Sequence, residues 1–169
     1  LTRQQLFPIF SATAPSQTLP ARQLILGRSG ETLLQGTADG DILLNRMAVN
    51  AIDAKAGDDI FILQYTAPNY TAGYIDADAE QSIALEFAPG HGKDVLYTLG
   101  DTRLGVVLNF AAGITRSEVF QNMRRMGDDL FIKTYADADE IRLVNFFSHY
   151  SHLEKLKFAG ESDGSIYAG

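Results

Sequence analysis

Apolar and polar positions follow a nine-residue period between residues 27 and 62. The seventh and eighth positions of the four blocks are Leu33 and Leu34, Ile42 and Leu43, Ala51 and Ile52, and Ile60 and Phe61. The sixth positions are small and polar: Thr32, Asp41, Asn50 and Asp59. A short apolar strand that follows a short polar turn at a fixed period is typical of stacked coils, in which each strand is buried against its neighbours.

The segments around these blocks divide the chain into regions. Residues 1–20 contain three prolines and predict an irregular lead-in. Residues 21–26 fit one further frame of the repeat, with Leu24 and Ile25 at its seventh and eighth positions. We therefore expect the repeat to occupy residues 21–65.

The period changes after residue 65. Residues 66–82 are rich in turn formers and acids, and predict a loop or a broken rung. Seven apolar or alternating stretches follow, separated by short turn segments, and this spacing is typical of an all-β meander. Gly127-Asp128 between two such stretches predicts a tight hairpin. We expect residues 66–169 to form a β-rich cap that packs with the repeat as one globular unit.

One stretch, residues 114–126, fits two structures. Ser117 could cap a short helix, and four apolar residues have helical spacing: Val119, Phe120, Met123 and Met126. We favour a strand there because of the tight turn that follows it.

The blocks resemble the glycine- and aspartate-rich nonapeptide of the RTX, or haemolysin-type, calcium-binding β-roll family, although no block begins with that family's paired glycines. Later motifs resemble the haemolysin-related segment that caps such rolls. They are Gly90, Gly92 and Asp94; Gly113-Ile114; Gly127 to Leu130; Asn145-Phe146; and Leu156, Phe158, Asp163 and Gly164. The resemblance implies an all-β fold, with a short parallel β-roll or β-helix over residues 21–65 continued by an antiparallel, sandwich-like cap.

A metal site is expected at one edge of this roll. A coil takes two nonapeptides, so Asp41 and Asp59, eighteen residues apart, should stack about 4.8 Å from each other. Two carboxylates at that distance repel by roughly 3 kcal/mol at an effective dielectric constant near 20. A calcium ion between them would reverse the sign, because calcium prefers carboxylate and carbonyl oxygens.

The resemblance implies that backbone carbonyls complete this calcium site. They would come from Gly36, Ala38, Lys55 and Gly57. The facing edge carries Thr32 and Asn50, without a carboxylate, and is expected to bind calcium poorly or not at all. Two alternatives stay open: a roll held by its apolar ladder without any ion, and a further calcium turn at residues 90–94 in place of a simple glycine turn.

Composition narrows the classes of function. The net charge of -7 argues against binding to nucleic acids or anionic membranes, and fits a cation-binding or extracellular protein. Without cysteine the chain can form neither a disulfide nor a thiolate metal site. No apolar run approaches the roughly 18 residues of a membrane helix. A start at Leu1 without a leader suggests a piece of a longer protein.

Candidate catalytic groups do not form a recognisable motif. Ser148, His149 and Asp137 could be assembled into a triad on paper, but no nucleophile elbow accompanies them. His149 and His152 would need a further ligand to hold zinc. We therefore expect no catalytic activity from this chain.

The resemblance implies a non-catalytic calcium-binding and folding module of a secreted bacterial RTX-type protein, a toxin or other exoprotein exported by type I secretion. Its partners would be a calcium ion and either a host surface receptor or the rest of its parent protein, with no nucleic acid and no membrane span. The alternative is a receptor- or glycan-recognition domain of a toxin or adhesin without functional calcium.

Overall fold

The computed structural model describes residues 22–28, 30–46, 49–65, 81–99, 104–135, 138–148, 152–161 and 165–167. The predicted lead-in and most of the loop over residues 66–82 lie outside these residues. The strands are β1 (Gln23–Leu26), β2 (Leu33–Gln35), β3 (Asp41–Leu44), β4 (Ala51–Asp53), β5 (Ile60–Gln64), β6 (Gln81–Phe87), β7 (Lys93–Leu99), β8 (Leu104–Phe110), β9 (Met123–Met126), β10 (Asp129–Tyr135), β11 (Asp139–Leu143), β12 (His152–Phe158) and β13 (Ser165–Tyr167), and the helix is α1 (Arg116–Gln121). The predicted all-β class is confirmed.

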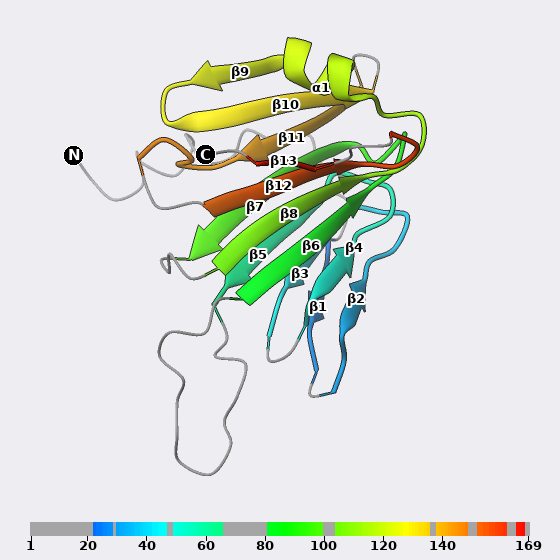
Figure 1. The fold of residues 1–169 in the computed structure, drawn as a ribbon. Helices are drawn as coiled ribbons and strands as arrows, with labels where there is room; N and C mark the ends of the chain where they lie inside the picture. Colours follow the sequence, from blue (N-terminus) through cyan, green and yellow to red (C-terminus); the bar gives the residue numbers. More distant parts are fainter. Residues whose placement is uncertain are drawn as a thin grey trace, which may run out of the picture.

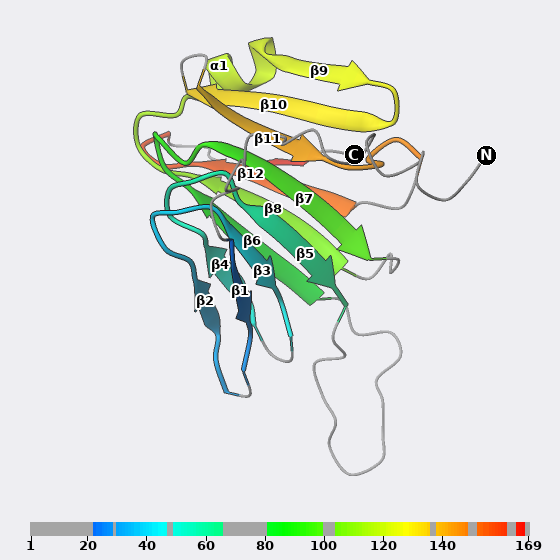
Figure 2. The same ribbon diagram turned by 180° about the vertical axis from the view of Figure 1, so that it is seen from behind.

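Two sheets face each other, and the chain alternates between them through its first eight strands. The first sheet has the order β1-β3-β5-β7-β11-β10-β9, and the second has the order β13-β12-β8-β6-β4-β2. The second sheet lies in front in Figure 1, and the reverse view in Figure 2 brings β3, β5 and β7 forward. Each pair of successive strands therefore makes one coil around a shared interior.

The expected step of eighteen residues per coil is confirmed in both sheets. Ile42 pairs in parallel with Ile60, and Leu33 pairs with Ala51. The added frame at residues 21–26 also forms a rung, since Leu24 pairs with Ile42. Apolar side chains at alternate positions point inward, which follows from the two-residue period of a strand.

The coil does not stop at residue 65, and the predicted antiparallel meander is wrong for most of the following strands. β6 stacks in parallel on β4, β7 on β5, and β8 on β6. Later, β11 adds to β7 and β12 adds to β8, again in parallel. Alternation along a strand fixes which side chains are buried but leaves the direction of its partner open. Antiparallel pairing is found only from β9 through β10 to β11 and between β12 and β13, within the described residues.

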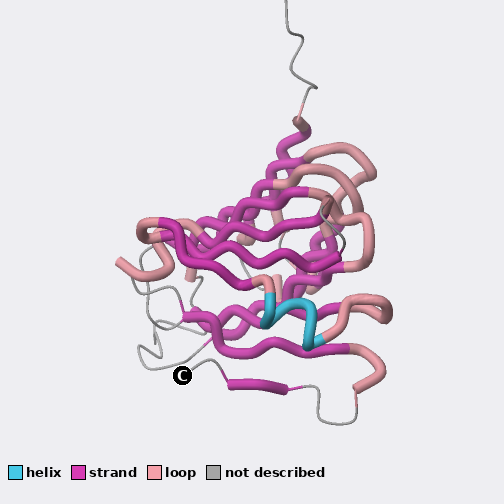
Figure 3. Tube along the Cα trace, turned by 90° about the horizontal axis from the view of Figure 1, so that it is seen from above, coloured by secondary structure: helices cyan, strands magenta, loops and turns pink. Residues whose placement is uncertain are grey.

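The stretch over residues 114–126 contains both structures. Helix α1 begins after Thr115, whose side chain accepts the Glu118 N–H while the Glu118 carboxylate accepts the Thr115 N–H. This capping box and the burial of Val119 stabilise a helical turn, so the strand predicted for residues 116–121 is wrong. The helix, cyan in Figure 3, leads into β9, and the predicted hairpin at Gly127 joins β9 to β10.

No helix in the described residues is long and apolar enough to cross a membrane.

Aromatic rings join the two sheets through the interior. Phe87, Phe110 and Phe158 lie on neighbouring strands of the second sheet, with centroids 6.0 Å apart between Phe87 and Phe110 and 5.0 Å apart between Phe110 and Phe158. Phe61, on the first sheet, lies 5.8 Å from Phe87. Burying one such ring stabilises the fold by about 1.5–3 kcal/mol, and ring pairing adds to this.

We predict that Phe110→Ala lowers the free energy of unfolding by about 3–5 kcal/mol, because it removes a ring that is 2% exposed and contacts two others. Phe120→Ala is the matched control, since this ring on α1 is 42% exposed, and it should cost less than about 1 kcal/mol. Urea unfolding of both variants measures the difference, and equal costs would contradict the placement of the core.

Candidate functional site

Three turns stack along one edge of the coil, and each ends in an aspartate. These turns, residues 36–41, 54–59 and 88–94, form what we call the aspartate edge. The pairing of Ile42 with Ile60 sets Asp41 beside Asp59, as predicted, and the pairing of Ile60 with Val95 sets Asp59 beside Asp94. All three carboxylates are at most 2% exposed, because their strand positions face the interior.

Asp59 and Asp94 each accept a hydrogen bond from the coil before them, whereas Asp41 accepts hydrogen bonds from its own turn. The Asp59 Oδ1 atom accepts the Asp41 N–H at 2.7 Å, and the Asp94 Oδ1 atom accepts the Asp59 N–H at 2.9 Å. The second oxygen of Asp41 accepts the N–H of Thr37 at 2.6 Å and its hydroxyl at 3.0 Å. The aspartates therefore form a ladder that runs along the coil and ties each turn to the next.

Two oxygens of this ladder are buried without a hydrogen-bond partner: Asp41 Oδ1 and Asp59 Oδ2. Each such atom costs about 1–3 kcal/mol of lost hydration. Burial raises the pKa of Asp59 to about 7, against the lowering effect of the Asp41 N–H, and repulsion from Asp94 and Asp41 raises it further. Neither of these two carboxylate oxygens therefore has a hydrogen-bond donor among the described residues.

The backbones of the three turns touch each other. A Cβ atom added to Gly36 would lie 2.4 Å from the Ala54 carbonyl oxygen. Gly57 has φ +116°, and its Cβ would lie 2.6 Å from the carbonyl carbon of Asp39. Lys55 adopts φ 77° in the same turn. Contact at this distance requires residues without side chains at the stacking points.

The residues that the sequence predicts for a calcium site lie in the first two of these turns. Gly36 and Ala38 lie in the first turn, Lys55 and Gly57 lie in the second, and the Lys55 ammonium pairs with Asp53. The described residues contain no group of three or more His, Cys, Asp or Glu side chains that could hold a metal. A calcium ion at the two unpartnered carboxylate oxygens would therefore need backbone carbonyls as its other ligands, which is the donor set that calcium accepts.

At the facing edge of the coil, the positions that correspond to Asp41 and Asp59 carry no carboxylate. Thr32 and Asn50 lie one above the other, and the Thr32 carbonyl accepts the Asn50 N–H at 3.0 Å. The sequence reasoning missed Asn45, which is fully buried there and exchanges two hydrogen bonds with the backbone of Gln64, at 2.8 and 2.6 Å. A neutral amide thus supports this edge.

Sequence reasoning also missed a buried chain of polar groups at the third turn. The His91 Nδ1 atom lies 2.6 Å from Asp94 Oδ2, and its Nε2 atom lies 2.5 Å from the Thr134 hydroxyl. Burial raises the pKa of Asp94, and the hydrogen bond from His91 opposes that shift. The order of groups resembles a hydroxyl-histidine-carboxylate triad, but exposures of 1–2% leave Thr134 inaccessible to a substrate.

A carboxylate from a distant strand closes the turn at residues 90–94. Asp139 Oδ2 accepts the Gly90 N–H at 2.5 Å, and Asp139 Oδ1 accepts the Gly92 N–H at 3.3 Å. The sequence signal that could have indicated this buried cluster is a histidine between two glycines, with an aspartate two residues later. Of the catalytic and zinc candidates, Ser148 is described, whereas Asp137, His149 and the side chain of His152 lie outside the described residues.

Comparison with known families, with curated proteins and with solved structures finds no match to this chain. The fold and the aspartate edge define an all-β protein whose strands stack mainly in parallel around an aspartate ladder. Membership of the RTX family stays a prediction.

The Asp59 carboxyl should make stability fall as the pH rises, when no metal is present. Its pKa in the folded protein, about 7, exceeds the ordinary 3.8, so the folded state binds the proton more tightly. The contribution is complete below about pH 4 and is lost as the pH rises through about 7, on the order of 4 kcal/mol. Asp59→Asn removes this dependence and keeps an oxygen acceptor for the Asp41 N–H.

Urea unfolding in chelator at about pH 5, 6, 7 and 8 measures the effect. The advantage of Asp59→Asn over the unsubstituted protein should grow with pH. The control is Asp58→Asn, at the exposed neighbouring position. A constant difference across the range would contradict the placement of an unsatisfied carboxyl at residue 59.

Proposed function

We propose that this chain is a non-catalytic calcium-binding and folding module of a secreted bacterial protein of RTX type, a toxin or other exoprotein exported by type I secretion. The observation that carries the proposal is the pair of stacked, buried carboxylates, Asp41 and Asp59, each with one oxygen that lacks a partner. A proton or a cation would offset the lost hydration of such oxygens. The coils of parallel strands with aspartate turns also support a calcium-binding role.

The residues that would hold the ion are those of the first two turns. Asp41 Oδ1 and Asp59 Oδ2 supply charge, and the carbonyls of Gly36, Ala38 and Gly57 supply neutral donors, together with that of Lys55. Bound calcium would supply positive charge that replaces the lost hydration of the two carboxylates. Asp94 is not required, since the Asp59 N–H and His91 already engage its two oxygens.

This arrangement couples the ion to folding. In an unfolded chain the carboxylates are hydrated and far apart, so the site exists only when the two turns stack. Free energy of calcium binding then becomes free energy of folding. A chain of this kind is least stable where calcium is scarce and gains stability where calcium is plentiful, as a protein that must leave a cell unfolded requires.

Calcium should stabilise the protein, and substitution of the paired aspartates should abolish the gain. A hundredfold excess of calcium over its dissociation constant adds about 2.7 kcal/mol to the free energy of unfolding. The measurement is urea and thermal unfolding, followed by β-sheet circular dichroism, in chelator and in millimolar calcium. Asp41→Asn with Asp59→Asn should remove the response and, at neutral pH, leave the metal-free protein at least as stable.

Asp128→Asn with Glu161→Gln is the control, because it removes the same charge at positions away from the first two turns and should keep the response. Magnesium at equal ionic strength separates specific binding from screening. If the metal-free protein is fully folded and indifferent to calcium, the proposal fails and a static recognition domain of a toxin or adhesin becomes the better account.

A further inference from the structure

Hydrogen bonds link the two carboxylates of the proposed calcium site to a strand that lies far along the sequence. The Thr134 hydroxyl, on β10, lies 2.5 Å from His91 Nε2, and His91 Nδ1 lies 2.6 Å from Asp94 Oδ2. The other oxygen of Asp94 accepts the Asp59 N–H at 2.9 Å, and Asp59 accepts the Asp41 N–H at 2.7 Å. We call these five residues the buried network, since each is at most 2% exposed.

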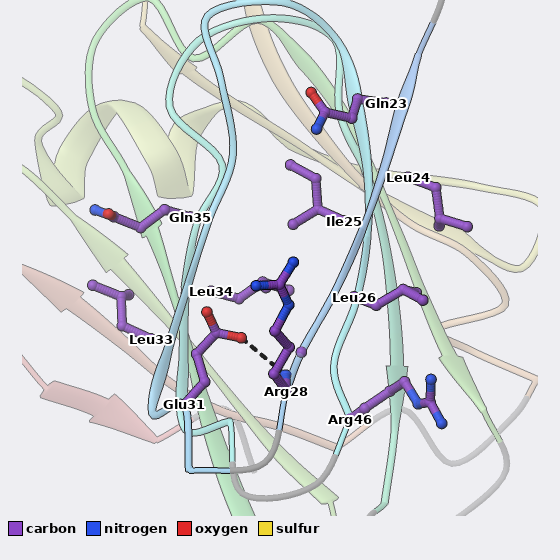
Figure 4. Close-up of a pocket in the computed structure, with 11 residues that line it drawn as sticks. Gln23, Leu24, Ile25, Leu26, Arg28, Glu31, Leu33, Leu34, Gln35 and Arg46 are labelled. Carbon is purple, nitrogen blue, oxygen red and sulfur yellow. Dashed lines mark hydrogen bonds between the residues drawn. The ribbon is translucent and has the colours of Figure 1, made fainter.

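The first coil gives these carboxylates little support. On the side of Asp41 away from Asp59, the described residues place only β1, where Gln23 pairs with Asp41. The space between β1 and β2 is a hollow of about 520 Å³, and Figure 4 draws the residues that line it. Asp41 Oδ1 has no partner, and Oδ2 accepts hydrogen bonds from Thr37 of the same turn. The contact that holds Asp59 from the next coil therefore comes from the third turn.

His91 fixes the orientation of the Asp94 carboxylate. An ionised carboxylate only accepts hydrogen bonds, so Nδ1 carries the ring proton and donates it to Asp94 Oδ2. With that oxygen engaged, Oδ1 stays directed at the Asp59 N–H. Without His91, Asp94 would hold a buried oxygen without a donor, which favours rotation of the carboxylate toward other donors. The Asp59 backbone would then lose a fixed point, and its stacking on Asp41 would loosen.

The ring of His91 is itself fixed from several elements. Phe87 of the second sheet meets it edge-on, with ring centroids 5.0 Å apart, and Thr134 of β10 contacts Nε2. Asp139 of β11 accepts the N–H groups of the two glycines on either side of the histidine. The β10–β11 pair therefore sets the position of this ring.

We propose that His91 is the positioning residue of the calcium site. It supplies no ligand: it holds Asp94, Asp94 holds the backbone of Asp59, and Asp59 stands beside Asp41 with one oxygen free. Calcium affinity thus depends on the docking of β10 and β11 against the third turn, so the ion binds tightly only to a chain that has folded through β11. This inference rests on the proposed function.

Removal of the ring nitrogens tests the role of His91. His91→Phe with Thr134→Val keeps a ring beside Phe87 and removes both partners of the Thr134 contact, so that only Asp94 loses a donor. The dissociation constant of calcium should rise about tenfold, as for other residues that orient a metal ligand. His91→Asn should restore the affinity to within about threefold of the unsubstituted protein, because its amide N–H lies near the place of Nδ1.

Ile132→Val is the matched control. Ile132 is fully buried on β10, two residues before Thr134, and the substitution removes a methyl group from the core without changing a member of the buried network. It should lower stability and leave the dissociation constant of calcium unchanged. Titration calorimetry of the full chain measures each constant, and circular dichroism gives the folded fraction by which it is corrected.

A spectroscopic measurement on the unsubstituted protein tests the same link if the double variant does not fold. The NMR signal of the His91 Nδ1 proton, assigned by its loss in His91→Asn, should shift as calcium is added. The charge of the ion polarises the Asp59 N–H bond to Asp94 and so changes the next hydrogen bond. The shift should saturate together with the heat of binding, in a solution where the metal-free protein is folded, with sucrose added where folding requires it.

The outcomes separate this inference from the proposed function. An unsubstituted protein that binds no calcium overturns the proposed function and this inference with it. If that protein binds calcium and the double variant binds it equally well, only the role of His91 is overturned. Tighter binding by the double variant also overturns it, because the freed Asp94 oxygen has then joined the site. The same conclusion follows if Ile132→Val weakens binding as much, if His91→Asn does not restore it, or if the Nδ1 proton does not respond.

Discussion

The structure depends on the hydrogen bonds that Asp59 and Asp94 accept from the coil before each of them. A chain that passes back and forth between two sheets must turn at the same point in every coil, or the apolar ladders lose their register. Asp59 accepts the Asp41 N–H and Asp94 accepts the Asp59 N–H, so each strand begins at a position fixed by its neighbour. A slip of one residue would turn the carboxylates outward and the apolar residues with them.

The same hydrogen bonds place the carboxylates of Asp41, Asp59 and Asp94 close together. The partners of their second oxygens differ from one aspartate to the next. At Asp94, His91 forms a hydrogen bond with the second oxygen. Asp139, from a strand far along the sequence, accepts the backbone N–H groups of Gly90 and Gly92 in the same turn. At Asp59 no protein group takes that oxygen, and its pKa rises to about 7. Both carboxylate oxygens of Asp94 thus have partners, whereas Asp41 Oδ1 and Asp59 Oδ2 have none.

The sequence predicts well those contacts that recur at a fixed step of eighteen residues. The rung at residues 23–26 and the stacking of Asp41 over Asp59 follow from an unbroken step of eighteen residues. The step from Asp59 to Asp94 is 35 residues, so the period no longer marks the partner, and the continued parallel coil could not be read from alternation alone. Thr115 and Glu118 form a capping box that local inspection could have found. The contacts of His91 with Thr134 and of Gly90 with Asp139 span 43 and 49 residues and depend on the finished fold.

A stack of parallel coils cannot close itself, because every added coil leaves the same two edges open. At the far end the chain changes direction, and the β9–β10–β11 strands end the first sheet with ion pairs such as Arg124 to Glu140. At the near end, β1 and β2 are the first strands of the described residues, and each pairs with a strand on one side only. Gln23 stands in register with Asp41, and Asp41 Oδ1 accepts no hydrogen bond. The unpartnered Asp41 Oδ1 atom and the one-sided pairing of β1 and β2 both belong to the first coil of the described residues.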